Sequence, residues 1–394
     1  MIEFDMIIVG GGLVGTSLAC ALENQALKIA LIDKSPLHSK PLHNFDARAL
    51  ALSLPSIECL QMLGVWPKIC ESASVIKTVH VSKQGHFGVT KICALEYQLP
   101  ALGYVVNADT LNNALNHVVE TLSNITLFRP AEIAKVEKID QGWVVQLSNQ
   151  KNLKTKLLVA ADGSESPLRK QQGIEVKVQN YQQTAILANI GLNQTHQGIA
   201  YERFLEKGSI AMLPFGENCV KCVYIVPSDQ VEILKAQSDE KFLENIQSQF
   251  GHRLGFFTQI GNRVFYPLKK LCTETLYADR FVLIGNAANT VHPIAAQGFN
   301  LGLRDAATLA EMLVQAKNAN QDIGSVEVLR SYADRRRDDH QAIRYFTDSL
   351  AEPRVFQWLG ILASEWVTPF KRRIAERGLG RHQSLPKLCR GVGL

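Results

Sequence analysis

No stretch of 18 or more consecutive apolar residues occurs in this sequence. A helix needs about 20 such residues to cross a bilayer, so we expect no membrane-spanning helix. Because the apolar residues of a first strand begin at Met6, we expect neither a signal nor a transit peptide. The sequence also shows no internal repeats and no low-complexity segments, which excludes repeat proteins and proteins of biased composition.

The eight cysteines form no disulfide framework. They are scattered along the chain at positions 20, 59, 70, 93, 219, 222, 272 and 389. Such spacing is typical of a reducing compartment, so we expect a cytoplasmic protein. The one close pair, Cys219 and Cys222, lies in a strand-like run in which residues three apart point to opposite faces. With no second pair and no nearby histidine, we predict no metal site.

Charge is ordinary in amount but uneven in position. Charged residues make up 20% and hydrophobic residues 46% of the 394 positions, as in soluble proteins of about two domains. The net charge is +5, yet Lys371–Leu394 alone carries seven basic residues and one acid, a local net charge of +6. Aromatic and aliphatic residues of 355–370 precede it. Either this segment contacts an anionic membrane surface or an acidic partner, or it is a terminal helix packed on the body. The basic segment is not accompanied by a recognised nucleic-acid-binding motif, so we expect no nucleic-acid partner.

A glycine-rich turn, Gly10–Gly15, follows the first predicted strand, 6–9, and begins a helix. Its first glycine permits the tight turn, Gly12 lets the backbone approach a pyrophosphate, and Gly15 lets helix and strand pack closely. A second strand ends in Asp33, 18 residues after Gly15, where an acidic residue would hold the ribose hydroxyls. Strand, turn, helix and acid in this order predict dinucleotide binding.

A second loop of small residues lies near the other end of the chain. The segment Gly285–Asp305 stands between a predicted strand, Phe281–Ile284, and a predicted helix, Ala306–Ala316. Backbone N–H groups at the start of such a helix can face an anion or a flavin ring.

The chain between these motifs is rich in strand patterns. A third turn, Asp162–Arg169, follows the apolar strand 156–160, and its Ser-Pro pair can start a helix. The other predicted elements are a hairpin over 75–89, helices over 108–122 and 240–250, strands over 131–137 and 143–147, and a β-rich block over 183–226. This order indicates a nucleotide domain assembled from separated pieces and interrupted by a mostly β domain.

The three turns resemble, in order and in residues, those of single-component aromatic hydroxylases that use FAD. Asp46–Ser53, Tyr201–Phe204 and 211–214 are similar to the branch that hydroxylates ubiquinone precursors, as is Tyr266-Pro267-Leu268. The resemblance spans nearly the whole chain. One departure is Asn286, which stands where most of the superfamily has Asp.

The resemblance implies an α/β fold: a Rossmann-like FAD-binding domain, an inserted mostly β substrate domain of the para-hydroxybenzoate hydroxylase type, and C-terminal helices. We expect the FAD-binding domain over 1–74, 100–175 and 270–354, and the substrate domain over 75–99 and 176–269. Residues 355–394 would form a helical basic tail.

The same resemblance assigns the site residues. Those expected to bind the cofactor are Gly10, Gly12, Leu13, Val14, Gly15, Asp33, Arg48, Asp162, Gly163, Gly285, Asn286, Pro293, Gln297, Gly298, Phe299 and Asn300. His292 is the one candidate for a catalytic group, because its imidazole titrates near neutral pH, although a structural hydrogen bond also explains a histidine there. Tyr201, Arg203 and Tyr266 either line a ring pocket or belong to the scaffold.

The implied activity is hydroxylation of a polyprenyl phenol with O₂ in ubiquinone biosynthesis, with NAD(P)H reducing FAD and a C4a-hydroperoxide delivering the oxygen. Such an enzyme would be cytoplasmic, with a peripheral position on the inner membrane or in a biosynthetic complex reached through the basic tail. Three alternatives stay open: a sister hydroxylase of different regiospecificity, a flavin oxidoreductase without oxygen insertion, and a non-catalytic flavin-holding subunit. The choice between NADH and NADPH is open as well.

Overall fold

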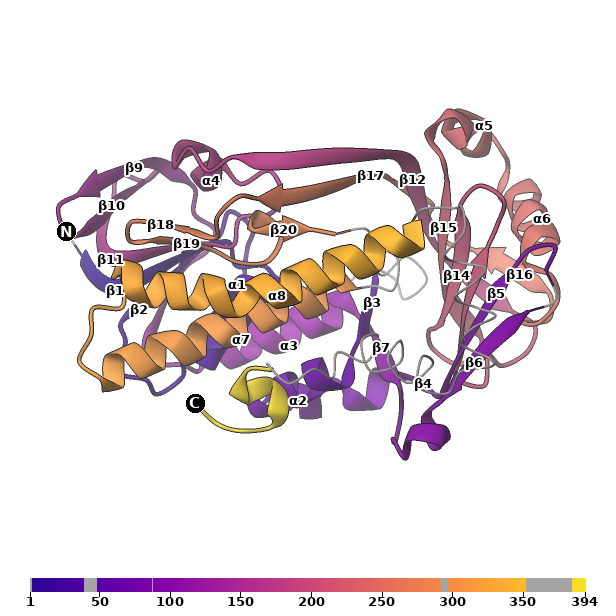
Figure 1. Cartoon of the computed structure of the whole chain (residues 1–394), viewed down its shortest axis with the longest axis horizontal. Coiled ribbons are helices and arrows are strands. Elements are labelled where there is room, and N and C mark those ends of the chain that lie inside the picture. The colour runs from indigo at the N-terminus through magenta and orange to yellow at the C-terminus, as the bar shows by residue number, and fades with distance from the viewer. Residues whose placement is uncertain (1, 39–47, 87, 292–296, 352–384) are drawn as a thin grey trace.

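The chain is described by a computed structural model that covers residues 2–38, 48–86, 88–291, 297–351 and 385–394 (Figure 1). Two large β-sheets lie at opposite ends of the molecule, and long helices run along the first of them (Figure 1). A small three-stranded sheet lies between them.

The first sheet has eight strands, in the order β18-β19-β11-β1-β2-β8, with β10 beside β11 and β9 beside β10. Five neighbouring strands, β19, β11, β1, β2 and β8, are parallel. Their bounds are β1 Ile2–Val9, β2 Ile29–Ile32, β8 Ile125–Phe128, β9 Ile133–Ile139, β10 Gly142–Leu147, β11 Asn152–Ala160, β18 Tyr277–Ala278 and β19 Phe281–Leu283. The segments 6–9, 29–32, 157–160 and 281–283 of the parallel strands are continuous, buried apolar runs because both faces of such a sheet are covered. The α/β class expected from the sequence is confirmed.

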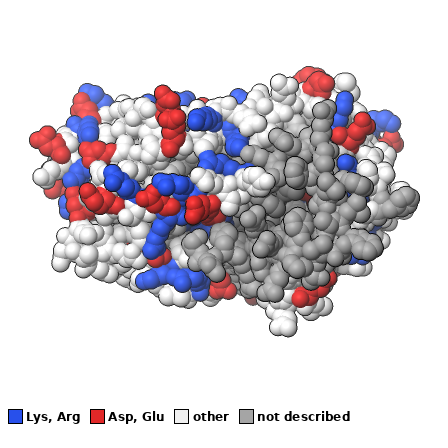
Figure 2. Space-filling model, in the orientation of Figure 1, with Lys and Arg blue, Asp and Glu red and all other residues white. Residues whose placement is uncertain are grey.

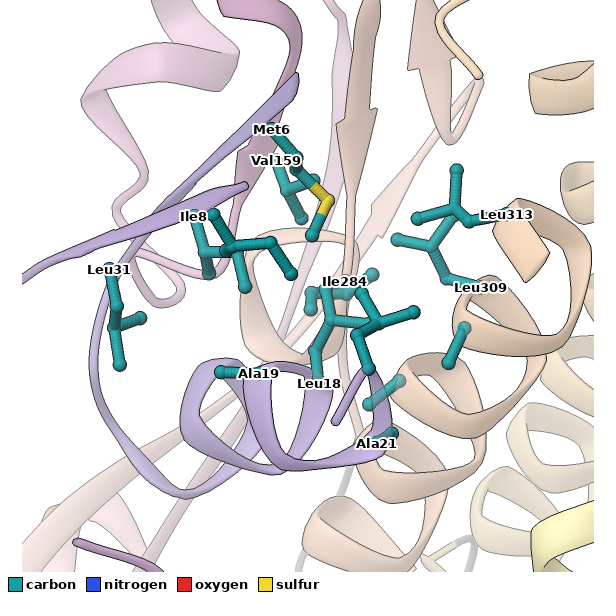
Figure 3. Close-up of a cluster of buried hydrophobic side chains, with 14 of the residues drawn as sticks. Met6, Ile8, Leu18, Ala19, Ala21, Leu31, Val159, Ile284, Leu309 and Leu313 are labelled. Carbon is teal, nitrogen blue, oxygen red and sulfur yellow. The ribbon is translucent and has the colours of Figure 1, made fainter. Parts of the chain in front are cut away.

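Four helices pack on this sheet and on one another. They are α1 Leu13–Ala21, α3 Ala108–Glu120, α7 Gln297–Asn318 and α8 Val326–Ala351. Figure 3 shows Met6 and Ile8 of β1 beside Leu18 of α1 and Leu309 of α7, all with no exposed surface. This buried cluster fixes α1 between the sheet and α7, so the turn that precedes α1 has a rigid support.

The second sheet has nine strands, in the order β20-β17-β12-β15-β14-β13-β5-β6, with β16 beside β12. Their bounds are β5 Thr78–Lys83, β6 Val89–Cys93, β12 Val176–Leu192, β13 Ile199–Phe204, β14 Ser209–Pro214, β15 Cys219–Pro227, β16 Phe257–Ile260, β17 Val264–Thr273 and β20 Asn289–Thr290. The antiparallel pair β5 and β6 confirms the predicted hairpin. One face packs on α5 Val231–Lys235 and α6 Asp239–Phe250 through Phe242, Ile246 and Phe250.

The small sheet joins the two large ones. It consists of β3 Ala49–Leu52, β7 Gly103–Asn107 and β4 Ser74–Ile76, and α2 Leu54–Met62 follows β3. Ile76, Leu102 and Val105 form one buried cluster with Ala200 and Leu213 of the nine-stranded sheet. This seam of apolar side chains holds the two halves of the molecule together.

The remaining short elements are η1 Trp66–Lys68, η2 Cys70–Ser72, η3 Ala94–Tyr97, α4 Pro167–Gln171, η4 Ser228–Gln230, η5 Gly285–Ala287 and η7 Lys387–Arg390. Ser166 caps α4 by accepting a hydrogen bond from the Arg169 N–H, as the Ser-Pro pair predicts.

Helix α7 begins earlier than the sequence predicts. It starts at Gln297, nine residues before the expected Ala306, and takes in the last part of the supposed loop. Its early glycine, Gly302, lies against Val14 of α1, where a Cβ atom would stand 2.8 Å from a Val14 methyl group. Glycine lowers intrinsic helix propensity, but this close helix–helix contact compensates for it.

The described end of the chain lies on the body. Leu388 and Cys389 of η7 are buried against α2, and the Lys387 N–H donates to Glu311 Oε2 of α7 at 2.9 Å. The rest of the expected helical tail, 355–384, lies outside the described residues.

None of the helices that the structure describes combines the length and the apolar character that crossing a bilayer requires. Where the described residues cover the face in Figure 2, Lys and Arg alternate with Asp and Glu.

Candidate functional site

The glycine turn between β1 and α1 contains glycines of two kinds. Gly10 has φ +106°, and a Cβ there would overlap the Ala161 carbonyl; a Cβ on Gly15 would overlap the Gly10 carbonyl. These two positions need glycine for the fold itself. At Gly12, by contrast, a Cβ would meet nothing within 4 Å. The space in front of Gly12 is therefore open to a ligand.

The first turn of α1 borders this open space. Gly12 is the N-cap residue, and no side chain caps the helix within the described residues. Leu13 and Val14 occupy the first two helical positions, where backbone N–H groups lack partners inside a helix. Such a terminus favours a phosphate group.

Asp33 lies at the carboxyl end of β2, beside the glycine turn. Its Oδ2 accepts from the Gly11 N–H at 2.6 Å and its Oδ1 from the Ser35 N–H at 2.7 Å. The carboxylate thus fixes the turn, and each oxygen keeps a lone pair for a hydroxyl group. Its binding of ribose stays a prediction.

Arg129 is a residue of this region that the sequence did not reveal. Its guanidinium donates to the carbonyl oxygens of Ser35 and Pro36 and to Asn116 Oδ1 at 3.1 to 3.4 Å. A Cβ on Gly11 would lie 3.0 Å from Arg129 Nη1, so the cation is at the edge of the glycine turn. Arg129 follows β8, 96 positions after Asp33, and only the parallel pairing of β2 with β8 brings them together.

The turn after β11 holds the second group of expected site residues. Gly163 has φ +90° and open space at its Cβ position. Asp162 accepts from the Leu168 N–H at 3.3 Å through Oδ2, whereas its buried Oδ1 has no partner among the described residues. Burial raises the pKa of Asp162. A buried carboxylate oxygen without a donor suits a ligand hydroxyl.

The third turn follows β19. Gly285 has φ +61°, and its N–H donates to Asp305 Oδ2 of α7 at 3.0 Å. Arg169 of α4 donates to the Ala287 carbonyl at 2.8 Å and to the Ser164 carbonyl at 2.8 Å, and so connects the second turn to the third. Asn286 is exposed between these fixed points.

A buried charge network supports this third turn from behind, and the sequence did not predict it. Asp305 Oδ1 contacts Arg336 Nε and His340 Nε2, each at 2.7 Å. Arg336 also pairs with Asp339 at 2.6 Å, and Asp339 with Arg304 at 2.7 Å. Burial by itself favours the neutral acid, but the charges of His340 and Arg336 outweigh it and hold the pKa of Asp305 below its usual value. Ionised Asp305 can therefore hold the Gly285 amide.

The first turn of α7 contains four of the expected residues. Asn300 is buried, accepts from the Ser53 N–H at 2.9 Å and the Ser56 hydroxyl at 2.7 Å, and donates to the Ala51 carbonyl at 2.9 Å. It connects α7 to β3 and α2. Gly298 faces open space, Gln297 is buried, and Phe299 packs on the main core. His292 and Pro293 lie outside the described residues.

Arg48 is the last expected cofactor residue. It immediately precedes β3, its side chain is exposed, and its carbonyl accepts from the Ala108 N–H at 2.7 Å.

These residues come from three turns that share one edge of the sheet. Strands β1, β11 and β19 are adjacent and parallel, so the turns that follow them meet at their carboxyl ends. After β1, the chain adds β2 on one side of β1 and later adds β11 on the other side. Such a reversal in the order of strands creates a crevice at their carboxyl ends, where ligands bind. Open space at Gly12, Gly163 and Gly298, a helix N-terminus and the orphaned Asp162 oxygen fit a phosphate-containing dinucleotide such as FAD.

Other candidate residues are placed elsewhere. Tyr201 packs edge-on against Phe250 in the core beneath α6, and Arg203 Nε donates to the Gln249 carbonyl at 2.8 Å, so both belong to the scaffold. Tyr266 is exposed. Burial raises the pKa of the Cys222 thiol to about 12 and that of Cys219 to about 11, which leaves both as unreactive thiols.

One group of potential metal ligands occurs among the described residues: His38, His117 and Glu120, all exposed. His38 Nε2 lies 3.0 Å from Glu120 Oε1, the distance of an ordinary hydrogen bond.

Comparison with known proteins identifies the family of this chain and several related proteins. The model of the FAD binding domain family matches residues 3–347. The ubiquinone hydroxylase UbiL of Rhodospirillum rubrum is 32% identical over 401 residues, which cover 99% of this chain and 93% of that protein. The ubiquinone hydroxylase UbiM of Neisseria meningitidis is 30% identical, with 95% and 84% covered. The structure of P. aeruginosa PqsL in complex with 2-aminobenzoylacetate superposes with a TM-score of 0.78 at 19% identity, covering 91% of this chain and 99% of that one.

The FAD binding domain family and the hydroxylase relatives together define a FAD-dependent monooxygenase. The chain belongs to the FAD binding domain family, and FAD is its cofactor.

Proposed function

We propose that this protein hydroxylates a polyprenyl phenol in ubiquinone biosynthesis, with O₂ as the oxygen donor and NAD(P)H as the reductant. The observation that carries the proposal is the meeting of three glycine-containing turns at one sheet edge, in a chain whose relatives are named ubiquinone hydroxylases. The alternatives are a sister hydroxylase that acts on another ring position and a flavin oxidoreductase that inserts no oxygen.

Bound FAD supplies the redox and oxygen-insertion chemistry. The residues of the chain bind and orient it. The α1 N-terminus and Gly12 would hold the pyrophosphate, and Asp33 the adenosine ribose. Asp162 and Gly163 would lie near the pyrophosphate, and Gly285 and Asn286 would meet the ribityl chain.

The reacting ring of the flavin would be bordered by 293–300 and approached by Arg48. His292 would handle a proton or make a structural hydrogen bond there. Neither role is needed for cofactor binding, so His292→Gln should keep its FAD.

The test is oxygen incorporation. Purified holoenzyme is mixed with NADH or NADPH, ¹⁸O₂ and a short-chain prenylphenol, and products are analysed by mass. One ¹⁸O atom in the phenol, with flavin bleaching by one of the two nucleotides, supports the proposal. Flavin bleaching with no labelled phenol supports the oxidoreductase alternative. An absence of bleaching with both nucleotides would contradict both enzymatic functions.

The ring position is a finer proposal. Gly285-Asn286-Ala287-Ala288 resembles the sequence of 2-octaprenyl-6-methoxyphenol hydroxylase within this branch. We therefore expect a deletion strain to accumulate the quinone precursor that this enzyme consumes. Accumulation of a different precursor, identified by mass, would assign the chain to a sister hydroxylase.

The domain division is also a proposal: FAD-binding residues 1–74, 100–175 and 270–354, and substrate residues 75–99 and 176–269. The seam around Val105 and Leu213 is where the two would meet. Amide hydrogen exchange should show FAD protecting the three turns of the first set more than the strands of the second.

A membrane contact through the basic segment is the proposed partner interaction. A polyprenyl phenol partitions into lipid, and each basic residue near an anionic surface contributes about 1 kcal/mol. Because η7 packs on α2, truncation would damage the body, so charge substitution is the cleaner test. Replacing Lys371, Arg372, Arg373, Arg377 and Arg381 by Gln should abolish salt-sensitive sedimentation with anionic liposomes and leave FAD content unchanged. Equal sedimentation of the two proteins would contradict the contact.

A further inference from the structure

Lys221 is a buried lysine at the seam between the two halves of the molecule. It lies on the central strand β15, directly opposite Asn189 of β12 and Leu213 of β14, and it is 6% exposed. Directly opposed residues of antiparallel strands share one face of the sheet. The Lys221 side chain is therefore on the face of Leu213, which packs on the small sheet, and not on the face covered by α6.

Arg48 is the second cation near Lys221: it is exposed, it immediately precedes β3 of the small sheet, and its charge reaches Lys221. Its neighbour in sequence, Ala49, packs in the same apolar cluster as Leu213. Lys221 of β15 and the start of β3 therefore meet at the same seam. Burial lowers the pKa of Lys221, and the positive charge of Arg48 lowers it further.

No acid balances this pair within the described part of the chain. Neither Lys221 nor Arg48 has a carboxylate in ion-pair contact there, and the only groups that favour the charged lysine are the thiols of Cys222 and Cys219. The acid on this face of the described strands is Glu202, and it is two strands away, opposite Ala211, which in turn is opposite Val223. A buried cation facing a second cation is costly unless an anion joins them.

We propose that Lys221 and Arg48 form a binding site for the oxyanion of the aromatic substrate. This inference rests on the proposed function, and it gives Lys221 a role in recognising the substrate of that reaction. A phenol held between two cations loses its proton more readily, and the phenolate ring is richer in electrons for attack by an electrophilic oxygen. Lys221 would donate a charge-assisted hydrogen bond to the phenolate oxygen. The phosphate groups of FAD are a second source of anionic oxygen, and the experiment separates the two.

The probe is 4-nitrophenol, whose phenolate has its own visible absorption band. Titrated into wild-type holoenzyme, it should bind as the phenolate, with an apparent pKa below that of the free probe. Lys221→Met should bind it on the order of tenfold more weakly and abolish the pKa decrease, and Lys221→Arg should retain both. Lys91→Met is the matched control, because Lys91 is an exposed lysine of the same sheet, opposite His80. It should behave as the wild type.

Three results would overturn the inference. Unchanged phenolate binding in Lys221→Met would show that the lysine does not contact the probe. A loss of FAD affinity in Lys221→Met with unchanged probe binding would assign the cation to the cofactor phosphates. A lower melting temperature of ligand-free Lys221→Met would show that the lysine already has a stabilising partner, whereas an equal or higher one supports the site. Because the probe binds without turnover, these results are independent of whether wild-type enzyme incorporates labelled oxygen.

Discussion

The glycines of the turn between β1 and α1 differ in what surrounds them. Gly10 and Gly15 are in contact with backbone, so the fold requires them, whereas Gly12 borders empty space. The sequence motif already predicts a different role for each of the three. The structure adds the contact that a Cβ atom would make at each position, and it leaves open space at Gly12 alone of the three.

Gly12→Val should abolish FAD binding while the protein stays folded, because the added side chain enters ligand space and its Cβ meets no protein atom within 4 Å. Gly393→Val is the control, since a Cβ there also meets nothing within 4 Å. Flavin fluorescence after reconstitution measures the affinity, and circular dichroism the fold. Normal flavin content in Gly12→Val would show that the pyrophosphate lies elsewhere.

Asn286 offers a second substitution at this scale. Asn286→Asp should still bind FAD, because most of the superfamily has Asp there, and Asn286→Leu should bind it about tenfold more weakly, because the ribityl hydroxyl loses its partner. The dissociation constants are measured by fluorescence titration of apoprotein. Equal values for all three proteins would place the residue outside the cofactor site.

Glu202 makes stability depend on pH. Burial raises its pKa to about 7, and its Oε1 has no hydrogen-bonding partner within the described residues. Because the pKa of Glu202 is raised in the folded protein, its protonated form favours folding below pH 4.5, the ordinary pKa value. This contribution to stability is lost as the pH rises through about 7. Glu202→Gln should therefore be more stable than wild type at pH 8, on the order of 1–3 kcal/mol, and similar to it at pH 4.5. Urea unfolding at both pH values measures this difference, with the exposed Glu206→Gln as control. A difference that does not change with pH would contradict the assignment.

At the scale of elements, helix α8 acts on the site without touching it. It presents Arg336 and His340 to Asp305 of α7, which holds the Gly285 turn. Tyr332 of the same helix donates to the Leu283 carbonyl at 3.2 Å, so α8 fixes β19 as well.

Asp305→Asn should destabilise the protein by about 3–5 kcal/mol, because the buried guanidinium of Arg336 loses one of the carboxylates that neutralise it. FAD affinity should fall with it, since the Gly285 turn loses its anchor. Asp334→Asn is the matched control: it breaks an exposed ion pair with Arg337 on the same helix and should cost less than about 1 kcal/mol. Urea unfolding and flavin titration provide the two measurements. Equal effects of the two substitutions would show that the network does not support the turn.

The elements that could be predicted are those with local signals. Apolar strands followed by glycine turns identify β1, β11 and β19, and the Ser-Pro pair identifies α4. The early start of α7 could not be predicted, because the reason for a glycine at position 302 of the helix, its close contact with Val14 of α1, is visible only in the fold. The partners of Asp305 are 31 and 35 residues away on another helix, and no spacing in the sequence connects them.

For the whole molecule, the sequence indicated which segments carry cofactor chemistry but not how distant segments meet. The parallel order of β2 and β8 brings Arg129 to the edge of the glycine turn near Asp33, and the seam between the sheets brings the start of β3 to Leu213, the residue opposite Lys221. Both arrangements depend on packing between segments about 100 or more residues apart. The family resemblance implied the class of fold, but the positions of individual side chains at the seam could be learned only from the structure.

The contact of η7 with α2 changes what kind of segment the basic stretch is. The described residues of α8 end at Ala351, and those of the last segment, among which Leu388 and Cys389 are buried, are held on α2 and α7. A protease that cuts the chain between these two parts should therefore leave the C-terminal fragment associated with the body in solution. A surface bound by Lys371–Arg381 would be linked to the body through both neighbouring parts of the chain, and two such links restrict rotation where a single one would not.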